Sequence, residues 1–401
     1  MNVPKLRFPE FSGEWEEKKL NKIFYKITKR NTDKKNTNVI TNSATEGLIS
    51  QRDYFDKDIA NIEKTDNYFV IQNGDFVYNP RKSSSAPYGP FTQYKLTNDG
   101  IVSPLYLCLR KIESAIDSKF LESYFKTACW HQYIYENGSA GARHDRVSIH
   151  DEVLLDMPLK IPSLPEQQKI ADFLSTVDSI IASETKILNA LQKKKKALMQ
   201  KLFSQQLRFK ADDGSEFPEW VEKKLGEVCE YIGGGTPSKK NKDYWNGTIN
   251  WASVKDITSK YLYETQDKIT QLGIESSTTN ICEPNTLILI TRMSPGKTVI
   301  SKCMTAINQD LKIVKSDIEV EFLHLLFQSI QTKIDEKTSG TTVKGISIDS
   351  LNKIDVQIPC KEEQQKIADC LSSLDNLIQN QQKIVTTWQQ RKKGLLQQMF
   401  V

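Results

Sequence analysis

The clearest pattern in the chain is an apolar stripe that occurs twice, about 200 residues apart. Its members are separated by alternating steps of four and three residues, which places them on one face of a helix. The first stripe consists of Ile170, Leu174, Val177, Ile181, Leu188, Leu191, Leu198 and Leu202. The second consists of Ile367, Leu371, Leu374, Ile378, Val385, Trp388, Leu395 and Met399. We therefore predict two long helices, over residues 163–207 and 361–401.

Polar residues interrupt both stripes at matching places. Glu184 and Lys195 break the first stripe, and Gln381 and Lys392 break the second. Either stripe alone could be the buried face of any long helix. Two matched stripes favour a pair, because a helix of this length needs a partner along it and each helix is the obvious partner of the other. We expect them to form a coiled coil.

Each stripe begins inside a longer repeat. Residues 166–181 read EQQKIADFLSTVDSII and residues 363–378 read EQQKIADCLSSLDNLI, with 11 of 16 positions identical. Further upstream, residues 15–20 match 220–225, and residues 6–8 match 207–209. The sequences between these blocks differ. A repeated frame with divergent inserts indicates one constant role performed twice and one variable role performed differently in each half.

The order of the repeated pieces predicts the topology. The chain runs insert, helix, insert, helix, so a two-fold relation between the halves makes the helices antiparallel and separates the inserts. Phe400 matches Phe203, and the piece that follows Phe203, Leu207 to Phe209, has its counterpart at the N-terminus as Leu6 to Phe8. The two chain ends are therefore expected to lie close together. Ser163 and Glu166 have the spacing of a capping box at the start of the first helix.

Both inserts, residues 1–160 and 208–358, contain short runs of β-branched and aromatic residues between glycine, proline and asparagine. This composition is typical of mixed domains with strands and helices. The predicted fold class is α+β: two mixed domains separated by two long antiparallel helices in a pseudo-two-fold, cyclic arrangement. A length of 401 residues agrees with more than one hydrophobic core.

The inserts also hold the candidate binding residues. Flexible glycine-rich backbone, lysines, aromatics and amides can supply phosphate contacts and base-edge hydrogen bonds together. In the second insert the candidates are Ser238, Lys239, Lys240, Tyr244, Trp245, Asn246, Trp251, Arg292, Lys297, Asn308, Gln309 and Lys344. In the first insert they are Gln51, Arg52, Tyr54, Asn79, Arg81, Lys82, Arg143, His144 and Arg146. The structural alternative for Trp245 and Trp251 is a pair of core tryptophans beside a glycine turn.

Composition and motifs exclude several other classes. Net charge is only +5, four histidines show no metal-ligand spacing, and seven cysteines without a C-x-x-C pair predict free thiols and no metal. Hydrolase motifs are absent, and so is the Asn-Pro-Pro-aromatic or Asp-Pro-Pro-aromatic tetrapeptide of methyltransferases that act on amino groups. The chain is therefore interpreted as a binding protein and not an enzyme. The N-terminus shows no apolar signal segment, and no apolar run approaches the roughly 18 residues of a membrane span. We therefore expect the protein to be located in the cytoplasm.

The chain resembles the specificity subunits of type I restriction-modification systems. The resemblance covers the whole chain and rests on the run Pro165 to Ala171, its second copy at Glu363 to Ala368, and the Gly-Gly-Thr-Pro-Ser run followed by Tyr244 to Trp251. In the second copy Glu362 replaces Pro165. The first insert is a weaker match, through residues 46–49, 79–81 and 102–104.

The resemblance implies two target-recognition domains, each reading one half of a split, asymmetric double-stranded DNA sequence. It further implies docking of two methylation subunits and of restriction motor-nuclease subunits. S-adenosylmethionine, ATP and Mg are then expected on those partners, with no cofactor on this chain. The rival hypothesis is a protein-protein scaffold that carries two adaptor domains on a coiled coil, which salt-dependent binding of duplex DNA would distinguish.

Overall fold

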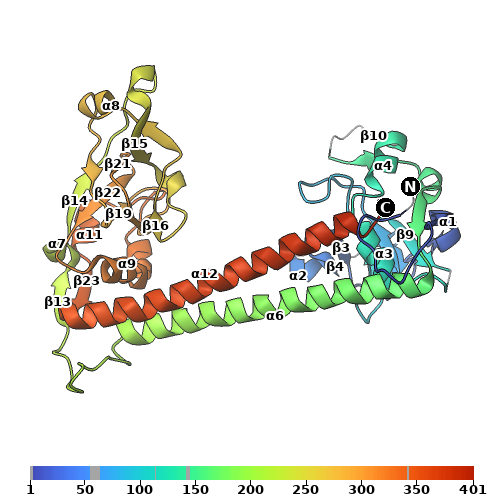
Figure 1. Ribbon diagram of the computed structural model, residues 1–401, viewed down its shortest axis with the longest axis horizontal. Coiled ribbons are helices and arrows are strands. Elements are labelled where there is room, and N and C mark those ends of the chain that lie inside the picture. Colours follow the sequence, from blue (N-terminus) through green and yellow to red (C-terminus); the bar gives the residue numbers. More distant parts are fainter. Residues whose placement is uncertain (1–2, 55–63, 113, 141–144, 341–342) are drawn as a thin grey trace. The chain divides into compact units, whose positions relative to one another are not determined.

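The computed structural model describes residues 3–54, 64–112, 114–140, 145–340 and 343–401. The chain divides into two units (Figure 1). Unit 1 comprises residues 1–185 and 383–401, and unit 2 comprises residues 186–382. No helix in the described part of the chain is long and apolar enough to cross a membrane.

Unit 1 contains a mixed domain built on short strands. A four-stranded antiparallel sheet has the order β2 (Phe24–Lys26), β9 (Leu107–Lys111), β6 (Phe76–Tyr78), β7 (Phe91–Gln93). Strand pairs complete the β-structure: β1 (Glu16–Lys19) with β12 (Pro158–Ile161), β3 (Ile40–Ser43) with β4 (Gly47–Ser50), β5 (Phe69–Ile71) with β8 (Gly100–Val102), and β10 (Ser139–Ala140) with β11 (Val147–Ser148). The short helices are α1 (Leu20–Ile23), α2 (Gln51–Tyr54), α3 (Ser118–Phe125), α4 (His131–Asn137) and α5 (Asp151–Leu155).

Unit 2 contains a second mixed domain with a different sheet plan. Its five-stranded sheet has the order β14 (Glu230–Gly233), β22 (Leu311–Lys315), β19 (Thr286–Ile290), β20 (Thr298–Ser301), β16 (Tyr261–Leu262). Its four-stranded sheet has the order β17 (Asp267–Ile269), β15 (Trp245–Ala252), β21 (Thr305–Ile307), β18 (Ile281–Cys282), and β13 (Val221–Lys224) pairs with β23 (Asp355–Ile358). The short helices are α7 (Leu225–Val228), α8 (Gln271–Glu275), α9 (Val320–Ser329), α10 (Gln331–Glu336) and α11 (Ile348–Asn352).

The two predicted long helices are confirmed as α6 (Leu164–Phe203, 40 residues) and α12 (Lys361–Gln398, 38 residues). Every member of both apolar stripes is buried or half-buried. In unit 1, Asp178 of α6 pairs with Lys392 of α12, and in unit 2, Lys195 of α6 pairs with Asp375 of α12. The start of each helix therefore lies beside the end of the other, which confirms the antiparallel pairing. Two of the four interruptions of the stripe, Lys195 and Lys392, thus make ion pairs between the helices.

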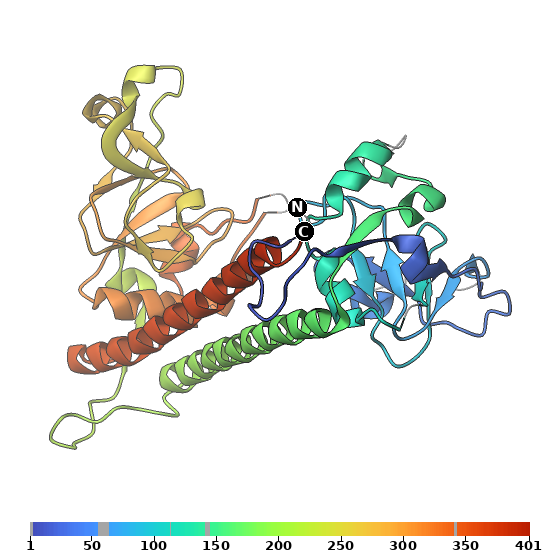
Figure 2. The same ribbon diagram turned by 45° about the vertical axis from the view of Figure 1, so that its right-hand side comes forward.

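The proximity of the termini is also confirmed, and Figure 2 shows the two ends together in unit 1. The Leu6 amide donates to the Gln398 carbonyl oxygen at 2.9 Å. In unit 2 the matching amide of Leu207 donates to Lys201 at 3.1 Å. The chain ends in unit 1 thus occupy the place where the chain is continuous in unit 2.

The repeated frame forms the same buried ion pair in each unit. Glu166 accepts from Arg7 through both carboxylate oxygens, at 2.8 Å each, and from Trp15 Nε1 at 3.3 Å. In unit 2, Glu363 accepts from Arg208 at 3.2 and 2.8 Å and from Trp220 Nε1 at 3.0 Å. The capping-box expectation was wrong, because the Glu166 carboxylate binds Arg7 and Trp15 and does not cap the helix.

The glutamine that follows each glutamate joins the frame to its mixed domain. Gln167 Oε1 accepts from the amide of Asp117, the residue that caps α3, at 2.8 Å. Gln364 Oε1 accepts from the amide of Glu319, which caps α9, at 3.0 Å. The repeated Glu-Gln dipeptide therefore fixes both the segment that carries the arginine and tryptophan and the first turn of a domain helix onto each long helix.

Candidate nucleic-acid interface

Two candidate segments of the first insert meet in unit 1. Arg81 and Arg146 form an isolated antiparallel bridge, and the Lys82 amide donates to the Asp145 carbonyl oxygen at 2.8 Å. The Asp145 carboxylate lies 3.9 Å from Nε of both arginines. One carboxylate thus faces two guanidinium groups, which leaves this pair of loops with an excess of positive charge. The candidates Arg143 and His144 lie outside the described residues.

The other candidates of the first insert take two roles. Gln51, Arg52 and Tyr54 form α2 directly after β4, and the Tyr54 side chain is exposed. Asn79 is buried: its Nδ2 donates to the Asn42 carbonyl at 3.0 Å and its Oδ1 accepts from the Arg81 amide at 3.0 Å. Asn79 is therefore placed to hold the loop that presents Arg81.

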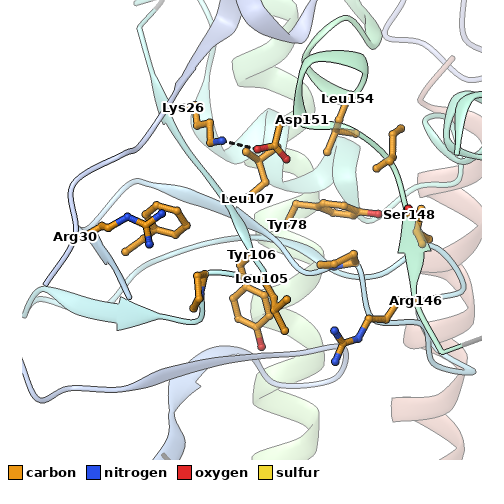
Figure 3. A pocket seen from close by; sticks show the side chains of 15 residues that line it. Lys26, Arg30, Tyr78, Leu105, Tyr106, Leu107, Arg146, Ser148, Asp151 and Leu154 are labelled. Carbon is orange, nitrogen blue, oxygen red and sulfur yellow. Dashed lines mark hydrogen bonds and ion pairs between the residues drawn. The ribbon is translucent and has the colours of Figure 1, made fainter. Parts of the chain in front are cut away.

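A cavity of about 510 Å³ opens beside these loops. Figure 3 shows Lys26, Arg30 and Arg146 around a group of aromatic and apolar side chains that includes Tyr78 and Tyr106. Lys26 is paired with Asp151 at 2.5 Å, so the lining keeps a net positive charge. Burial raises the pKa of Tyr78, whose hydroxyl donates to the Tyr88 carbonyl at 2.8 Å. The cavity therefore adjoins the cationic surface formed by Arg81 and Arg146, and aromatic side chains line it.

A basic loop that adjoins this cavity was not among the predicted binding residues. Lys29, Arg30, Lys34 and Lys35 are exposed on the segment after β2. The loop is held by buried Asn31, which donates to the Asn36 carbonyl at 2.8 Å and accepts from the Asn36 amide at 3.1 Å. The run KRNTDKK at residues 29–35 carried a signal, since four of its seven residues are basic.

In unit 2 the glycine-rich loop packs against β15. Trp245 Nε1 donates to the Ser238 carbonyl at 3.2 Å, and the Lys239 ammonium lies 6.0 Å from the centre of the Trp245 ring. Trp251 is buried and donates to the Gly235 carbonyl at 3.0 Å. The loop therefore exposes Ser238, Lys239 and Lys240, and buried Trp251 supports it. Tyr244 is half-buried, and Asn246 is exposed with left-handed backbone (φ 60°) at the irregular start of β15.

A second group in unit 2 comes from three segments. Arg292 is bridged to Gly345 and lies 3.5 Å from the Asp310 carboxylate, and the Lys344 carbonyl accepts from the Met293 amide. Gln309, next to Asp310, accepts from Thr236 of the glycine-rich loop at 2.5 Å. The structure thus brings Arg292, Gln309 and Lys344 together.

Two other candidates of unit 2 are placed differently. Asn308 is buried, and its Oδ1 accepts from the Asp310 amide at 3.1 Å. Asn308 therefore shapes the turn that carries Gln309. Lys297 lines a separate cavity of about 290 Å³ with His324 and residues of both long helices, away from the Arg292 group.

These two sets of cationic loops, carried on one repeated frame, agree with what comparison with known proteins shows. Residues 12–193 and 218–387 match the family described as "Type I restriction modification DNA specificity domain". This chain belongs to that family. The specificity-subunit prediction is thereby confirmed, together with a recognition role in place of a catalytic one.

Curated relatives of this specificity subunit include two restriction-enzyme subunits. The MjaIX specificity subunit of Methanocaldococcus jannaschii is 32% identical over 189 residues, which cover 45% of this chain and 44% of that protein. The match therefore spans less than half the length of that relative. The EcoR124I/EcoR124II specificity subunit of Escherichia coli is 25% identical over 350 residues, which cover 83% of each chain.

Solved structures show the same fold at low identity. A chain from a study of complex assembly and conformational transition of the type I restriction-modification system superimposes with a TM-score of 0.62 at 16% identity, covering 96% of this chain and 97% of that one. The S subunit from M. genitalium gives a TM-score of 0.55 at 15% identity, covering 100% and 99%. The predicted fold class, two mixed halves with paired long helices, is confirmed.

All seven cysteines are free, as predicted, and Cys108, Cys229 and Cys282 are buried. Among the residues that the structure describes, no group of three or more His, Cys, Asp or Glu side chains is arranged to hold a metal ion.

Proposed function

We propose that this specificity subunit reads a split DNA target, with residues 1–160 recognising one half and residues 208–358 the other. The observation that carries the proposal is the repeated frame: the same Arg-Glu-Trp cluster, Arg7, Glu166 and Trp15 or Arg208, Glu363 and Trp220, supports two sets of loops with different residues. A constant support with two different reading surfaces is what an asymmetric, two-part sequence requires.

The loop geometry supports different DNA contacts for different residues. Arginine can make two hydrogen bonds to guanine, and glutamine two to adenine. We therefore assign base contacts to Arg81 and Arg146 in the first domain and to Arg292 and Gln309 in the second. The remaining candidates are assigned to supporting and phosphate contacts: Gln51, Arg52, Tyr54 and Lys82 in the first domain, and Ser238, Lys239, Lys240, Tyr244, Trp245, Asn246 and Lys344 in the second. Arg143 and His144, which lie outside the described residues, are assigned to the same role in the first domain.

The basic loop at residues 29–35 extends this assignment. Lysines neutralise phosphates without reading sequence, so Lys29, Lys34 and Lys35 would add affinity in a salt-dependent way. Arg30 is partly committed, because its Nη1 donates to the Asn67 carbonyl at 2.6 Å and its guanidinium lies over the Phe69 ring. We therefore assign this loop to contacts with the DNA phosphate backbone and not to recognition of bases.

The long helices offer surfaces for partners. Unit 1 exposes Phe173 of α6 and Ile384 of α12, and unit 2 exposes Ile187 of α6 and Leu377 of α12, each at 38–52% of its full accessible area. Ile187 and Ile384 occupy matching positions of the repeat. An apolar residue exposed at the same place twice supports the docking of two copies of one partner, which we propose to be the methylation subunits.

The remaining parts of the complex follow from the family. Restriction motor-nuclease subunits would join this core, and S-adenosylmethionine, ATP and Mg would be held by the partners, in the cytoplasm. This chain would supply recognition alone.

The proposal is tested by sequencing the methylated bases in cells that express this chain with its methylation subunits. The expected result is a motif with two specified halves around an unspecified gap. Fluorescence anisotropy of that duplex with the purified complex should then show affinity that falls steeply with salt. Lys34→Ala with Lys35→Ala should lower the slope of log affinity against log salt by about 2 without changing the motif. A continuous motif, or binding insensitive to salt, would contradict the proposal.

A further inference from the structure

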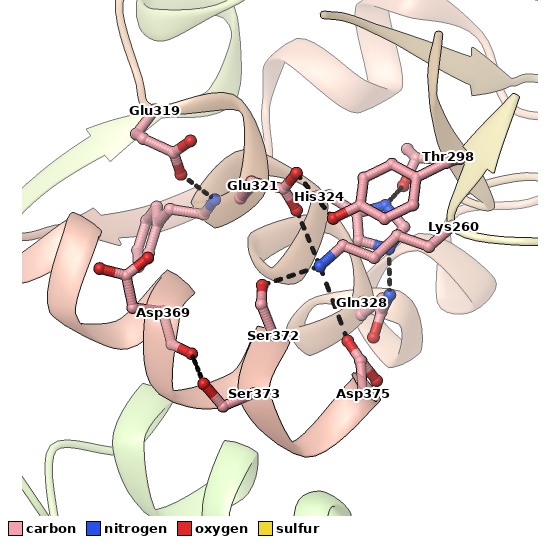
Figure 4. Close-up of polar contacts among 12 residues, drawn as sticks. Lys260, Thr298, Glu319, Glu321, His324, Gln328, Asp369, Ser372, Ser373 and Asp375 are labelled. Atoms are coloured by element: carbon pink, nitrogen blue, oxygen red, sulfur yellow. Dashed lines mark hydrogen bonds and ion pairs between the residues drawn. The ribbon is translucent and has the colours of Figure 1, made fainter. Parts of the chain in front are cut away.

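A polar cluster of low exposure ties the mixed domain of unit 2 to α12 (Figure 4), and Lys195 of α6 joins it. Asp375 of α12 binds Lys195 of α6, with 2.5 Å between Nζ and Oδ1. Lys260, which directly precedes β16, lies 3.7 Å from the other oxygen of the same carboxylate. Its ammonium also donates to Ser372 Oγ of α12 at 2.9 Å and pairs with Glu321 of α9 at 2.7 Å. Lys260 therefore spans from a domain helix to a scaffold helix.

The cluster is nearly balanced in charge and shielded from water. The side chains of Lys260, Lys195, Glu321 and Asp375 are 14, 18, 20 and 26% exposed. Burial alone would lower the pKa of Lys260, but the hydrogen bond and charge of Glu321 together with the charge of Asp375 raise it. Lys260 is consequently charged and is held by a hydrogen bond to Ser372 and by ion pairs with Glu321 and Asp375. Ion pairs of low exposure persist only in a fixed geometry, because each charge needs its partners in place.

Neighbouring groups complete the surroundings of Lys260. The Tyr261 hydroxyl donates to Glu321 Oε1 at 3.0 Å, and Lys302 lies 3.9 Å from the same oxygen. His324 of α9 is hydrogen-bonded to Thr298 and Gln328, and burial and the charge of Lys260 lower its pKa to about 4. His324 is therefore neutral at pH 7, and the lysine has two carboxylates as its charged partners.

The internal repeat supplies a comparison within the same molecule. Asp178, Lys392 and Ser175 are the counterparts of Asp375, Lys195 and Ser372. In the described part of unit 1, Asp178 pairs with Lys392 and with no basic residue of the mixed domain. The ion pair between helices is thus common to both units, whereas the lysine from the mixed domain belongs to unit 2. Pairing of the helices does not require Lys260, so Lys260 has another role.

We propose that Lys260 is a positioning residue that holds the second recognition domain at one setting on the long helices and thereby fixes the number of unspecified base pairs between the half-sites. The inference rests on the proposed function. Base pairs are stacked about 3.4 Å apart, so a domain that shifts by a few ångströms can serve a gap one base pair longer or shorter. The apolar contacts of the domain with α12, which include Phe322, Ile367 and Leu371, remain when Lys260 is replaced.

The test uses cells that express the chain with its methylation subunits and compares the methylated sites of four versions: wild type, Lys260→Met, Lys260→Arg and Lys268→Met. Lys268 is the matched control, because it lies in the same domain and pairs with Glu264 of the same segment, whose side chain is exposed. We expect wild type and Lys268→Met to methylate a single gap length. Lys260→Met should keep both half-site sequences but methylate sites with the gap changed by one base pair at a tenth or more of the native-gap level. Lys260→Arg should restore most of the single-gap preference.

A folded, active Lys260→Met variant with the wild-type gap alone would overturn the inference, as would a change in the second half-site sequence. If Lys260→Met does not fold, Ser372→Ala removes only the hydroxyl that Lys260 binds: off-gap methylation above wild type supports the inference, and an unchanged single gap refutes it. A wild-type motif with no gap would instead refute the proposed function, and this inference with it.

Discussion

Replacing the buried glutamate of the repeated frame is expected to destabilise one unit selectively. Glu363 is completely buried and binds Arg208 through both oxygens and Trp220 Nε1 through one. In Glu363→Gln the shape is kept, but the charge is lost and an amide NH2 faces N–H donors. The change therefore leaves a guanidinium of low exposure without its carboxylate.

The magnitude can be worked from these contacts. Breaking a buried ion pair by removing one partner costs about 3–5 kcal/mol. Arg208 keeps two carbonyl acceptors, Pro218 at 2.6 Å and Phe217 at 3.2 Å, which compensate part of the loss. We expect a loss of about 3 kcal/mol in the free energy of unfolding of unit 2. Glu166→Gln should cost unit 1 about the same, since Arg7 likewise keeps the Gly13 and Ser12 carbonyls.

Urea unfolding measures the size of the stability loss, and hydrogen exchange detected by mass spectrometry shows which segments are affected. Faster exchange should appear in β13, β23 and α9 for Glu363→Gln, and in β1, β12 and α3 for Glu166→Gln. Glu10→Gln, which removes a surface partner of Lys169, is the control and should show no measurable loss. If both variants lose less than about 1 kcal/mol in the free energy of unfolding, this cluster does not anchor the units.

Three further predictions concern other parts of the molecule. In the unfolded chain His324 takes up a proton near pH 6.5, whereas in the folded chain its pKa is about 4. Unit 2 should therefore have its full stability above pH 6.5 and lose about 2 kcal/mol of its free energy of unfolding between pH 7 and pH 5. Urea titrations should show this loss, and His324→Gln should abolish it. Seven residues added after Leu191 and again after Trp388 keep the stripe and lengthen the paired helices by about 10 Å, so the methylated motif should widen by about three base pairs in its gap, and an unchanged gap in an active variant would rule out a ruler. Arg292→Ala should reduce discrimination at one base position by about 1–3 kcal/mol in competition binding, whereas an equal loss on all sequences would identify a phosphate contact.

The frame could be predicted from the sequence because its signals are periodic and repeated. Heptad-like spacing identified the stripes, and the repeat identified Arg7, Trp15 and their counterparts as a matched set. The partner of these residues could not be predicted, because the capping-box pattern gave Glu166 a purely local role. A contact across 159 residues leaves no mark in local spacing.

The reading loops were harder to predict for a physical reason. Polar residue type does not separate a side chain that faces solvent from one that supports a loop: Asn79 and Asn308 are buried, while Gln309 and Arg81 beside them are exposed. The basic loop at residues 29–35 was overlooked, although four of its seven residues are basic. Lys260 gave no sequence signal at all, since its partners lie on two other elements, α9 and α12.

Independent reading by two domains is tested most directly by replacing residues 226–350 with the corresponding segment of another specificity subunit and sequencing the methylated bases. We expect a hybrid motif, in which the half read by residues 1–160 is unchanged and the other half becomes that of the donor. Loss or alteration of both halves in a folded, active hybrid would contradict it.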